Sequence, residues 1–248
     1  RGLKRYRCVD VLGEDQYRML QVDAPGVPPE ERVQALRWRL KDAVEFPVDG
    51  AAIAVADIPV EGGRQASVFA VVSPSAVVGE RMALFHEAKI PLEAIDIPEM
   101  AVRNIAALFE EANRGLAFLA LAHGDGILTI TFRGELYLSR RIEVSSAALA
   151  DADSERRRQM LERLALELQR TFDNVERQYG AGPIDRVIVQ CEQFTEAVLA
   201  GLARDLPVPV HGVAGGAVDG RFLLVSGSTQ AGLTSGGTGR VFELTLPP

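Results

Sequence analysis

The segment His123-Gly124-Asp125-Gly126 contains the residue types that a phosphate-binding turn uses. Glycines let backbone N–H groups approach a phosphate, and a carboxylate such as that of Asp125 positions a bound cation or water molecule. The same Gly-Asp-Gly composition is typical of a solvent-exposed hairpin turn. Both interpretations are open, and we favour the hairpin turn.

The sequence lacks other familiar catalytic and metal-binding motifs. The Gly/Ser/Thr-rich stretch 226–240 has no Gly-Lys-Ser/Thr ending of a Walker loop and is interpreted as a flexible connector. The histidines share no ligand spacing with acids or cysteines, and the apolar patterns around His86 and His211 favour a packing role. Cys8 and Cys191 lie far apart with no neighbouring ligands, so we expect reduced core residues and no bound metal.

Trp38 is the only tryptophan of the chain and lies between Arg37 and Arg39. Tryptophan and arginine are enriched at binding hot spots, because a broad ring and a planar guanidinium fill a desolvated pocket. Leu36 and Leu40 belong to the apolar stripe of the same predicted helix, so Trp38 points to another side of it. Trp38 therefore either packs against the neighbouring hairpin or contacts a partner.

Strands and helices alternate along the first half of the chain. Pro28 and the acidic residues after it begin one helix, Ser75 is expected to cap a second, and Gly115 is expected to end a third that starts at Pro98. Runs of apolar residues predict strands, of which the third and fourth form a hairpin. These strands are 7–12, 17–22, 51–58, 66–72 and 92–97.

The second half predicts a ribonuclease H-like mixed sheet. Strands joined by tight turns pair antiparallel, whereas strands joined through helices run parallel. One long helix, about 155–178, has a single apolar face formed by Leu161, Leu164, Leu168, Phe172, Val175 and Tyr179. The expected order is strands 116–122, 126–132 and 135–144, that helix, strand 186–190, helix 194–206 and strand 208–213.

The overall composition fits a globular α/β protein of 248 residues, with 47% hydrophobic and 25% charged residues. We expect two lobes, 1–115 and 116–248. The net charge of -7 argues against a nucleic-acid partner. No apolar run is long enough to cross a bilayer, and the first residues do not resemble a signal peptide. The missing initial Met suggests that a native N-terminal segment has been removed.

Several segments resemble the PilM family, the actin-like proteins of type IV pilus assembly. They are IDIPEMAVRNIAALF (95–109), the hairpin 117–144 and ELQRTFD (167–173). The stretch 14–49 resembles the branch that serves mannose-sensitive haemagglutinin pili. The resemblance covers nearly the whole chain. It implies an α/β, actin-like ATPase fold of two lobes, with a small α+β subdomain inserted in the first lobe at about 14–92.

The resemblance also implies a nucleotide site clasped by one loop from each lobe. We expect the first loop to precede Arg1. Aligned on the turn at Gly134, the Asp-x-Gly of the second loop falls on Ala120, Leu121 and Ala122. Alanine cannot hold a metal-bound water, so only a shifted loop at His123–Gly126 would replace it.

The remaining nucleotide contacts of the family are also weakened. The adenosine-contacting turn, which carries two glycines in relatives, falls near Gln190 and Cys191, followed by Glu192. Glu167 and Arg170 match the helix that borders the nucleotide, although a solvated helix face explains them as well. We therefore expect no catalytic residue, no ATPase activity, no metal and no resident cofactor, with Mg-ATP binding doubtful.

The family implies a bitopic PilN-like membrane protein as partner, whose short cytoplasmic N-terminal peptide docks in a groove of the first lobe. Our candidates for this contact are Arg37, Trp38, Lys41, Glu99 and Arg103. Solvated charge is the alternative for the last two.

The family also implies a protein on the cytoplasmic side of the inner membrane of a Gram-negative bacterium. The expected function is a scaffold of the pilus assembly platform, and the alternative is an adaptor whose partner affinity is controlled by bound ATP. The assembly ATPase is a further candidate partner, and strand exchange between two copies is a route to a homodimer. Arg156, Arg157 and Arg158 either contact anionic lipid or form a solvated helix face.

Overall fold

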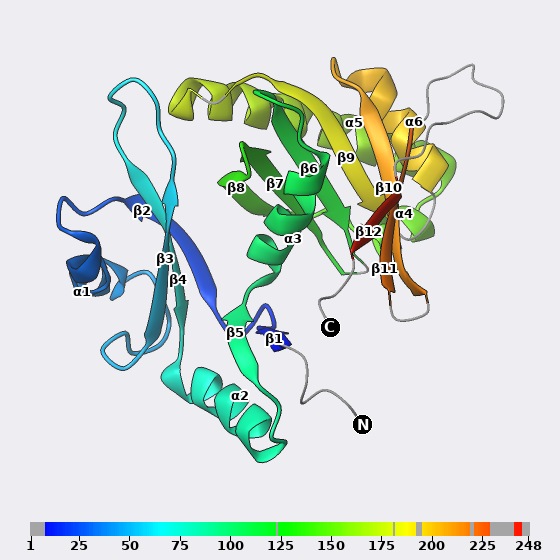
Figure 1. Ribbon diagram of the computed structural model, residues 1–248. Helices are drawn as coiled ribbons and strands as arrows, with labels where there is room; N and C mark the ends of the chain where they lie inside the picture. Colours follow the sequence, from blue (N-terminus) through cyan, green and yellow to red (C-terminus); the bar gives the residue numbers. More distant parts are fainter. Residues whose placement is uncertain are drawn as a thin grey trace. The chain divides into compact units, whose positions relative to one another are not determined.

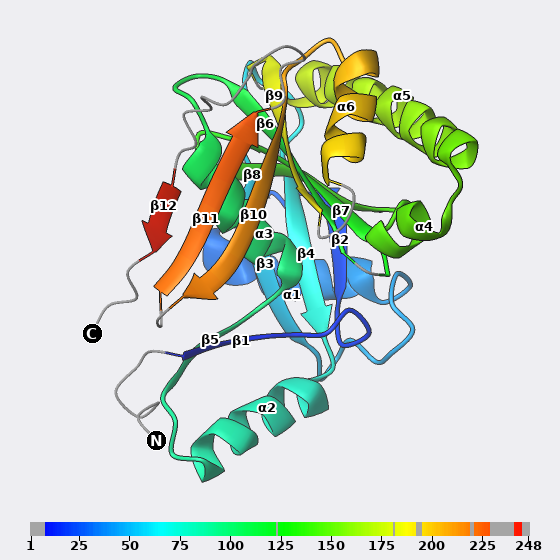
Figure 2. The ribbon, with the colours of Figure 1, turned by 90° about the vertical axis from the view of Figure 1, so that its right-hand side faces the viewer.

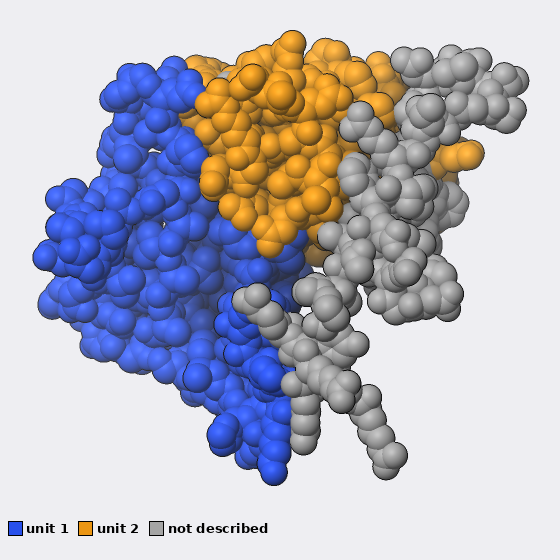
Figure 3. Space-filling model, viewed as in Figure 1, with its two compact units in different colours: residues 1–101, 247–248 blue, residues 102–246 orange. Residues whose placement is uncertain are grey.

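The computed structural model describes residues 8–122, 124–180, 182–191, 195–218, 221–228 and 241–244. These residues divide into two compact units between Ala101 and Val102 (Figure 3). The division lies before the boundary near 115 that we expected from the sequence. The reason is that Val102 and Ile105 pack into the hydrophobic core of the second unit.

The first unit contains a three-stranded antiparallel sheet in the order β2-β4-β3 (Figure 1). Its strands are β2 (Arg18–Asp23), β3 (Ala52–Ile58) and β4 (Ser67–Ser73). Helix α1 (Pro29–Leu40) buries Leu36 and Leu40 in a core with Val68 and Val72 of β4. As predicted, proline and acidic residues occupy its first turn, where they favour the positive end of the helix.

A parallel pair of strands, β1 (Cys8–Val11) and β5 (Leu92–Asp96), completes the first unit. The three-stranded sheet, α1 and helix α2 (Ser75–Glu87) all lie between β1 and β5 in sequence, as an inserted subdomain would. The predicted cap of α2 is wrong. Ser75 is already helical, and its hydroxyl donates to the carbonyl oxygen of Gly50 instead.

The second unit is built on a seven-stranded sheet in the order β12-β11-β10-β9-β6-β7-β8. The predicted ribonuclease H-like arrangement is confirmed: β6, β7 and β8 pair antiparallel, while β9 and β10 run parallel to β6. Residues 226–228, which we expected in a flexible connector, belong to β11. The strands are β6 (Gly115–Leu121), β7 (Gly126–Phe132), β8 (Glu135–Ile142), β9 (Ile184–Cys191), β10 (Val210–Val218), β11 (Arg221–Ser228) and β12 (Val241–Leu244).

Helix α5 (Ser154–Tyr179) is the long helix predicted from the apolar stripe, and the six stripe residues are buried as expected. Asp153 caps its N-terminus by accepting from the backbone N–H of Arg156, and Gly180 ends it with a left-handed φ of 69°. A short helix not predicted from the sequence, α4 (Ser146–Asp151), precedes it. No helix in the described ranges is long and apolar enough to span a membrane.

Helices cover both faces of the seven-stranded sheet (Figure 2). On one face, α5 packs against α6 (Thr195–Asp205) so closely that a Cβ on Gly201 would lie 2.6 Å from Leu161. On the other face lies α3 (Pro98–Ala106), which ends earlier than predicted. It continues as a 3-10 turn (Ala107–Phe109), because Phe109 docks against Phe118 of β6 and residue 110 becomes extended.

Candidate functional site

The carboxyl ends of β6 and β9 meet at one edge of the sheet, because these neighbouring strands are parallel. The pairing places Ala120 opposite Gln190 and Leu121 opposite Cys191. The structure therefore brings together the β6 and β9 residues that the family resemblance placed at the nucleotide. Of these residues, Ala120 contacts the core beneath α3, and Leu121 and Cys191 are buried.

The turn after β6 is closed by contacts within the second unit. The backbone N–H of Ala122 donates to the carbonyl oxygen of Asp125 at 2.9 Å, and Ser146 donates to the carbonyl oxygen of Ala122 through both its N–H and its hydroxyl. The Asp125 carboxylate accepts from Arg141 at 2.5 Å. This acid is already paired with a cation of its own chain. His123 lies outside the described residues.

The two glycines of this turn have different surroundings. A Cβ on Gly124 would have open space around it. A Cβ on Gly126 would lie 2.5 Å from Cγ1 of Ile142 and 2.7 Å from the carbonyl oxygen of Val144. Gly126 is therefore required by the close approach of β8, which is a packing reason for this glycine.

Glu167 and Arg170 lie away from this turn. The Glu167 carboxylate accepts from Arg140 of β8 at 2.6 Å, and β7 separates β8 from β6 in the sheet. Arg170 is exposed on α5. Across the described part of the chain, no cluster of His, Cys, Asp and Glu is arranged to hold a metal ion. The described residues of the second-unit site therefore include no preformed metal cluster, and Asp125, the acid of the turn, is paired with Arg141.

Trp38 is 76% exposed, so the interpretation that it packs against the neighbouring hairpin is wrong. Lys41, at the C-terminal end of α1, is also exposed. Arg37, in contrast, donates to the carbonyl oxygens of Val48, Asp49 and Ala51 and holds the loop after α1. Of Arg37, Trp38 and Lys41, only Trp38 and Lys41 therefore have side chains that are open to a partner.

The other two partner candidates are bound within their own units. Glu99 is buried, and its carboxylate accepts from the hydroxyl of Tyr17 at 2.5 Å. Arg103 bonds to Asn104 at 2.9 Å and to Glu135 at 3.3 Å. Glu99 is not solvated, contrary to the alternative considered for it, because the fold surrounds it with the apolar residues near Tyr17.

Two further expectations are corrected by the side-chain positions. His86 is exposed on α2, because this helix buries none of its residues, whereas we expected His86 to be packed. Of the three adjacent arginines, Arg157 donates to backbone carbonyls of Leu149 and Ala152, and Arg158 pairs with two glutamates of α5. A contact of all three with lipid is therefore not supported.

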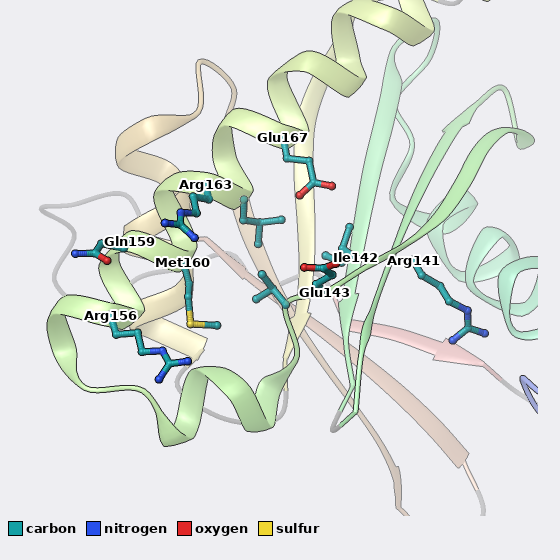
Figure 4. A pocket seen from close by; sticks show the side chains of 10 residues that line it. Arg141, Ile142, Glu143, Arg156, Gln159, Met160, Arg163 and Glu167 are labelled. Atoms are coloured by element: carbon teal, nitrogen blue, oxygen red, sulfur yellow. The ribbon is translucent and has the colours of Figure 1, made fainter.

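Sequence reasoning missed a groove between β8 and α5. It has a volume of about 680 Å³, and of its polar and charged lining residues only Glu167 and Arg156 had been singled out from the sequence (Figure 4). A signal was present in the sequence, since arginines recur every seven residues at 156, 163, 170 and 177.

Comparisons with solved structures identify the fold. The PilM-PilN type IV pilus biogenesis complex aligns with 18% identity over 80% of this chain and 67% of that chain, with a TM-score of 0.56. A Bacteroides thetaiotaomicron protein with an actin-like ATPase fold and unknown function aligns with 10% identity over 82% and 67%, with a TM-score of 0.43. The cytoplasmic domain of EpsL, an inner membrane component of the Vibrio cholerae type II secretion system, aligns with 14% identity over 73% and 60%, with a TM-score of 0.40.

Together with the sheet order, the first of these similarities shows that the chain has the actin-like ATPase fold. No protein-family model matches the chain, and no curated protein matches its sequence significantly.

Proposed function

We propose that the chain is a scaffold of a type IV pilus or type II secretion assembly platform and does not hydrolyse ATP. Its fold is similar to that of a chain in the PilM-PilN complex, and its segments 95–109, 117–144 and 167–173 resemble the PilM family. In this proposal, the first unit binds the cytoplasmic N-terminal peptide of a bitopic PilN-like protein. The protein then acts at the cytoplasmic face of the inner membrane of a Gram-negative bacterium.

The observation that carries the proposal is the closed turn after β6. An actin-like ATPase needs an acid at this turn to position Mg²⁺ and glycines to admit phosphate. Here the acid is Asp125, which Arg141 neutralises, and Gly126 is filled by the approach of β8. Opening the turn would break an ion pair and move a strand, whereas a protein scaffold needs neither change.

The exposed tryptophan supports peptide binding as the retained activity. A ring that is 76% exposed on a well-packed helix gains more from a partner than from its own fold, because burial of an aromatic side chain is strongly favourable. Lys41 lies three positions further along the chain and adds a positive charge. We assign Trp38 and Lys41 to the peptide contact.

The assignment to one particular pilus system rests on the resemblance of residues 14–49 to the branch that serves mannose-sensitive haemagglutinin pili. We propose that the chain is the MshI protein of that system, with the assembly ATPase of the same machine as a second partner. A comparison of PilN-like peptides tests this choice. The peptide of the haemagglutinin pilus system should bind more tightly than the corresponding peptides of other pilus systems.

Calorimetric titration of the full-length protein tests the function, first with Mg-ATP and then with the N-terminal peptide of its PilN-like neighbour. The expected result is a peptide binding signal and no heat from Mg-ATP. Binding of Mg-ATP at micromolar affinity would instead establish the nucleotide-gated adaptor. Absence of peptide binding would remove the scaffold proposal.

A further inference from the structure

Four arginines form a row along helix α5, at positions 156, 163, 170 and 177. Seven residues make nearly two helical turns, so the row drifts by only about 20° per step and stays on one side of the helix. Successive members are about 10 Å apart, since each residue rises about 1.5 Å. All four are exposed.

The guanidinium groups of this row are not neutralised by their surroundings. Within the described part of the chain, none of the four makes a side-chain hydrogen bond or ion pair. Other arginines of α5 behave differently, since Arg158 pairs with Glu155 and Glu162 at 2.6 Å each. In a chain of net charge -7, this row of unpaired cations forms a local positive surface, and it favours an anionic ligand.

The row borders two adjacent hollows between α5 and β8. One part, of about 680 Å³, lies between residues 141–144 and the first half of α5, and a second part, of about 580 Å³, lies between Leu138, Arg140 and the second half. Both parts include Glu167 in their lining, so they lie next to each other at the ion pair that Glu167 makes with Arg140. We name these two parts together the β8–α5 groove.

The floor of the β8–α5 groove is apolar and its rim is basic. Leu138, Ile142, Met160 and Leu164 line it beneath the arginines. The Glu167 carboxylate is already paired with Arg140, and Figure 4 shows the Arg141 side chain pointing away from α5. The other charges that line the groove are the four arginines of the row and the carboxylate of Glu143.

Strand β8 lies at the edge of the seven-stranded sheet. Among the described residues it pairs with β7 alone, so its outer backbone groups are available to a further strand. Its eight residues extend about 26 Å, and the arginine row extends about 30 Å, from standard rises per residue. The backbone edge and the row of cations therefore match in length.

We propose that the β8–α5 groove binds an extended acidic segment of a partner protein. The segment adds to β8 as a strand, and its Asp and Glu side chains pair with the arginines of α5. This site lies on the second unit and is independent of the peptide contact proposed for Trp38. The recessed apolar floor and the free strand edge favour a peptide over a flat anionic membrane, which would contact only the rim.

Fluorescence anisotropy with a labelled peptide of alternating Glu and Val tests the proposal on the full-length chain. About twelve residues suffice to span the groove at about 3.3 Å per residue. The Glu-Val peptide should bind, and a Lys-Val peptide should not. A peptide of the same length made of Glu-Pro-Pro repeats should also fail, because alternate residues of a strand point their N–H groups to opposite sides and one proline of each pair would face β8 without a donor.

Variants test whether peptide binding depends on the arginines of the groove or only on the overall charge of the protein. The double variant Arg163→Gln/Arg170→Gln should weaken the Glu-Val peptide about tenfold or more, since it removes two carboxylate partners. The variants Arg163→Gln and Arg158→Gln each remove one positive charge from α5; the first, in the groove, should weaken binding, and the second, outside it, should bind as the parent does. Unfolding curves check that all variants stay folded.

Three outcomes would overturn the proposal. The first is that the Glu-Val peptide does not bind, and the second is that Arg158→Gln weakens it as much as the double variant does. The third is that the double variant binds the Glu-Val peptide as tightly as the parent does, whether or not it loses binding to phosphatidylserine vesicles or to an oligonucleotide. The Trp38-dependent peptide should bind the double variant normally, so this proposal and the scaffold function fail separately.

Discussion

At the residue scale, one segment supports two different chemical interpretations until its contacts are known. The composition of residues 123–126 suits both a phosphate loop and a hairpin turn. The contacts favour the hairpin turn, because Asp125 is paired with Arg141 and Gly126 faces the side chain of Ile142. Contacts also distinguish two adjacent residues of α1: Arg37 donates to backbone carbonyl oxygens, whereas Trp38 is exposed.

Gly126→Ala tests the packing role of this glycine. The added methyl group would collide with Ile142 and with the backbone at Val144, so the free energy of unfolding should fall by about 1–3 kcal/mol. Gly124→Ala is the matched control and should change it by less than about 0.5 kcal/mol, since nothing lies within contact of its added carbon. Urea denaturation measures both, and equal effects would contradict the packing explanation.

Trp38→Ala tests the proposed peptide surface. Affinity for the PilN-like peptide should fall at least about tenfold, because the ring is assigned to the contact. Stability should change by less than about 0.5 kcal/mol, because the side chain is mostly exposed. Met82→Ala removes another exposed apolar side chain of the first unit and should bind the peptide normally. An unchanged affinity for Trp38→Ala would exclude this surface.

At the element scale, the parallel pairing of β9 and β10 brings a histidine close to a charged cluster. His211 lies opposite Ile188 in the ladder and is half-buried. Burial lowers the pKa of His211 below its ordinary value of 6.5, and the nearby Arg186 lowers it further, while Asp185 and Glu111 act in the opposite direction. Sequence pattern alone indicated packing for this residue but could not reveal these charges.

The stability of the protein should therefore depend on pH through His211. The unfolded chain binds the proton of this residue more tightly than the folded chain, so stability is full above about pH 6.5 and falls as the pH drops toward the lowered pKa. The variant His211→Gln should lose less stability than the parent as the pH falls, because glutamine does not take up a proton in this range. Urea denaturation at about pH 8 and about pH 5.5 measures it. Parallel losses in parent and variant would show that other groups are responsible.

At the scale of the whole molecule, the chain forms two units, each with a core of its own. Leu36, Leu40 and strand β4 form one core, while the sheet of the second unit packs against α3 on one face and α5 and α6 on the other. When each unit has its own core, a substitution that destabilises one core should mainly promote unfolding of that unit.

Leu40→Ala and Leu202→Ala test this independence. Both residues are fully buried, in α1 and α6 respectively, and each truncation should destabilise its own unit by about 2–5 kcal/mol. Hydrogen exchange should accelerate in β2–β4 for Leu40→Ala and in β9–β10 for Leu202→Ala. Acceleration across both units in either variant would show that the two cores unfold together.

The sequence by itself determined most of the local structure and the order of the second sheet. Apolar periodicity is a local property, so it located the buried face of α5, the hairpin β3–β4 and the mixed pairing of β6 to β10. The short turns and helical crossovers then restricted the possible pairings.

Only the tertiary structure decided which polar residues are free to act. The row of arginines can be read from the sequence, but the lack of partners for it cannot, because partners come from any part of the chain. The sequence assigned Glu99 to a partner surface. In the structure its carboxylate instead accepts from Tyr17, which is distant in sequence. Function depends on such long-range contacts, and these form only when the strands and helices pack.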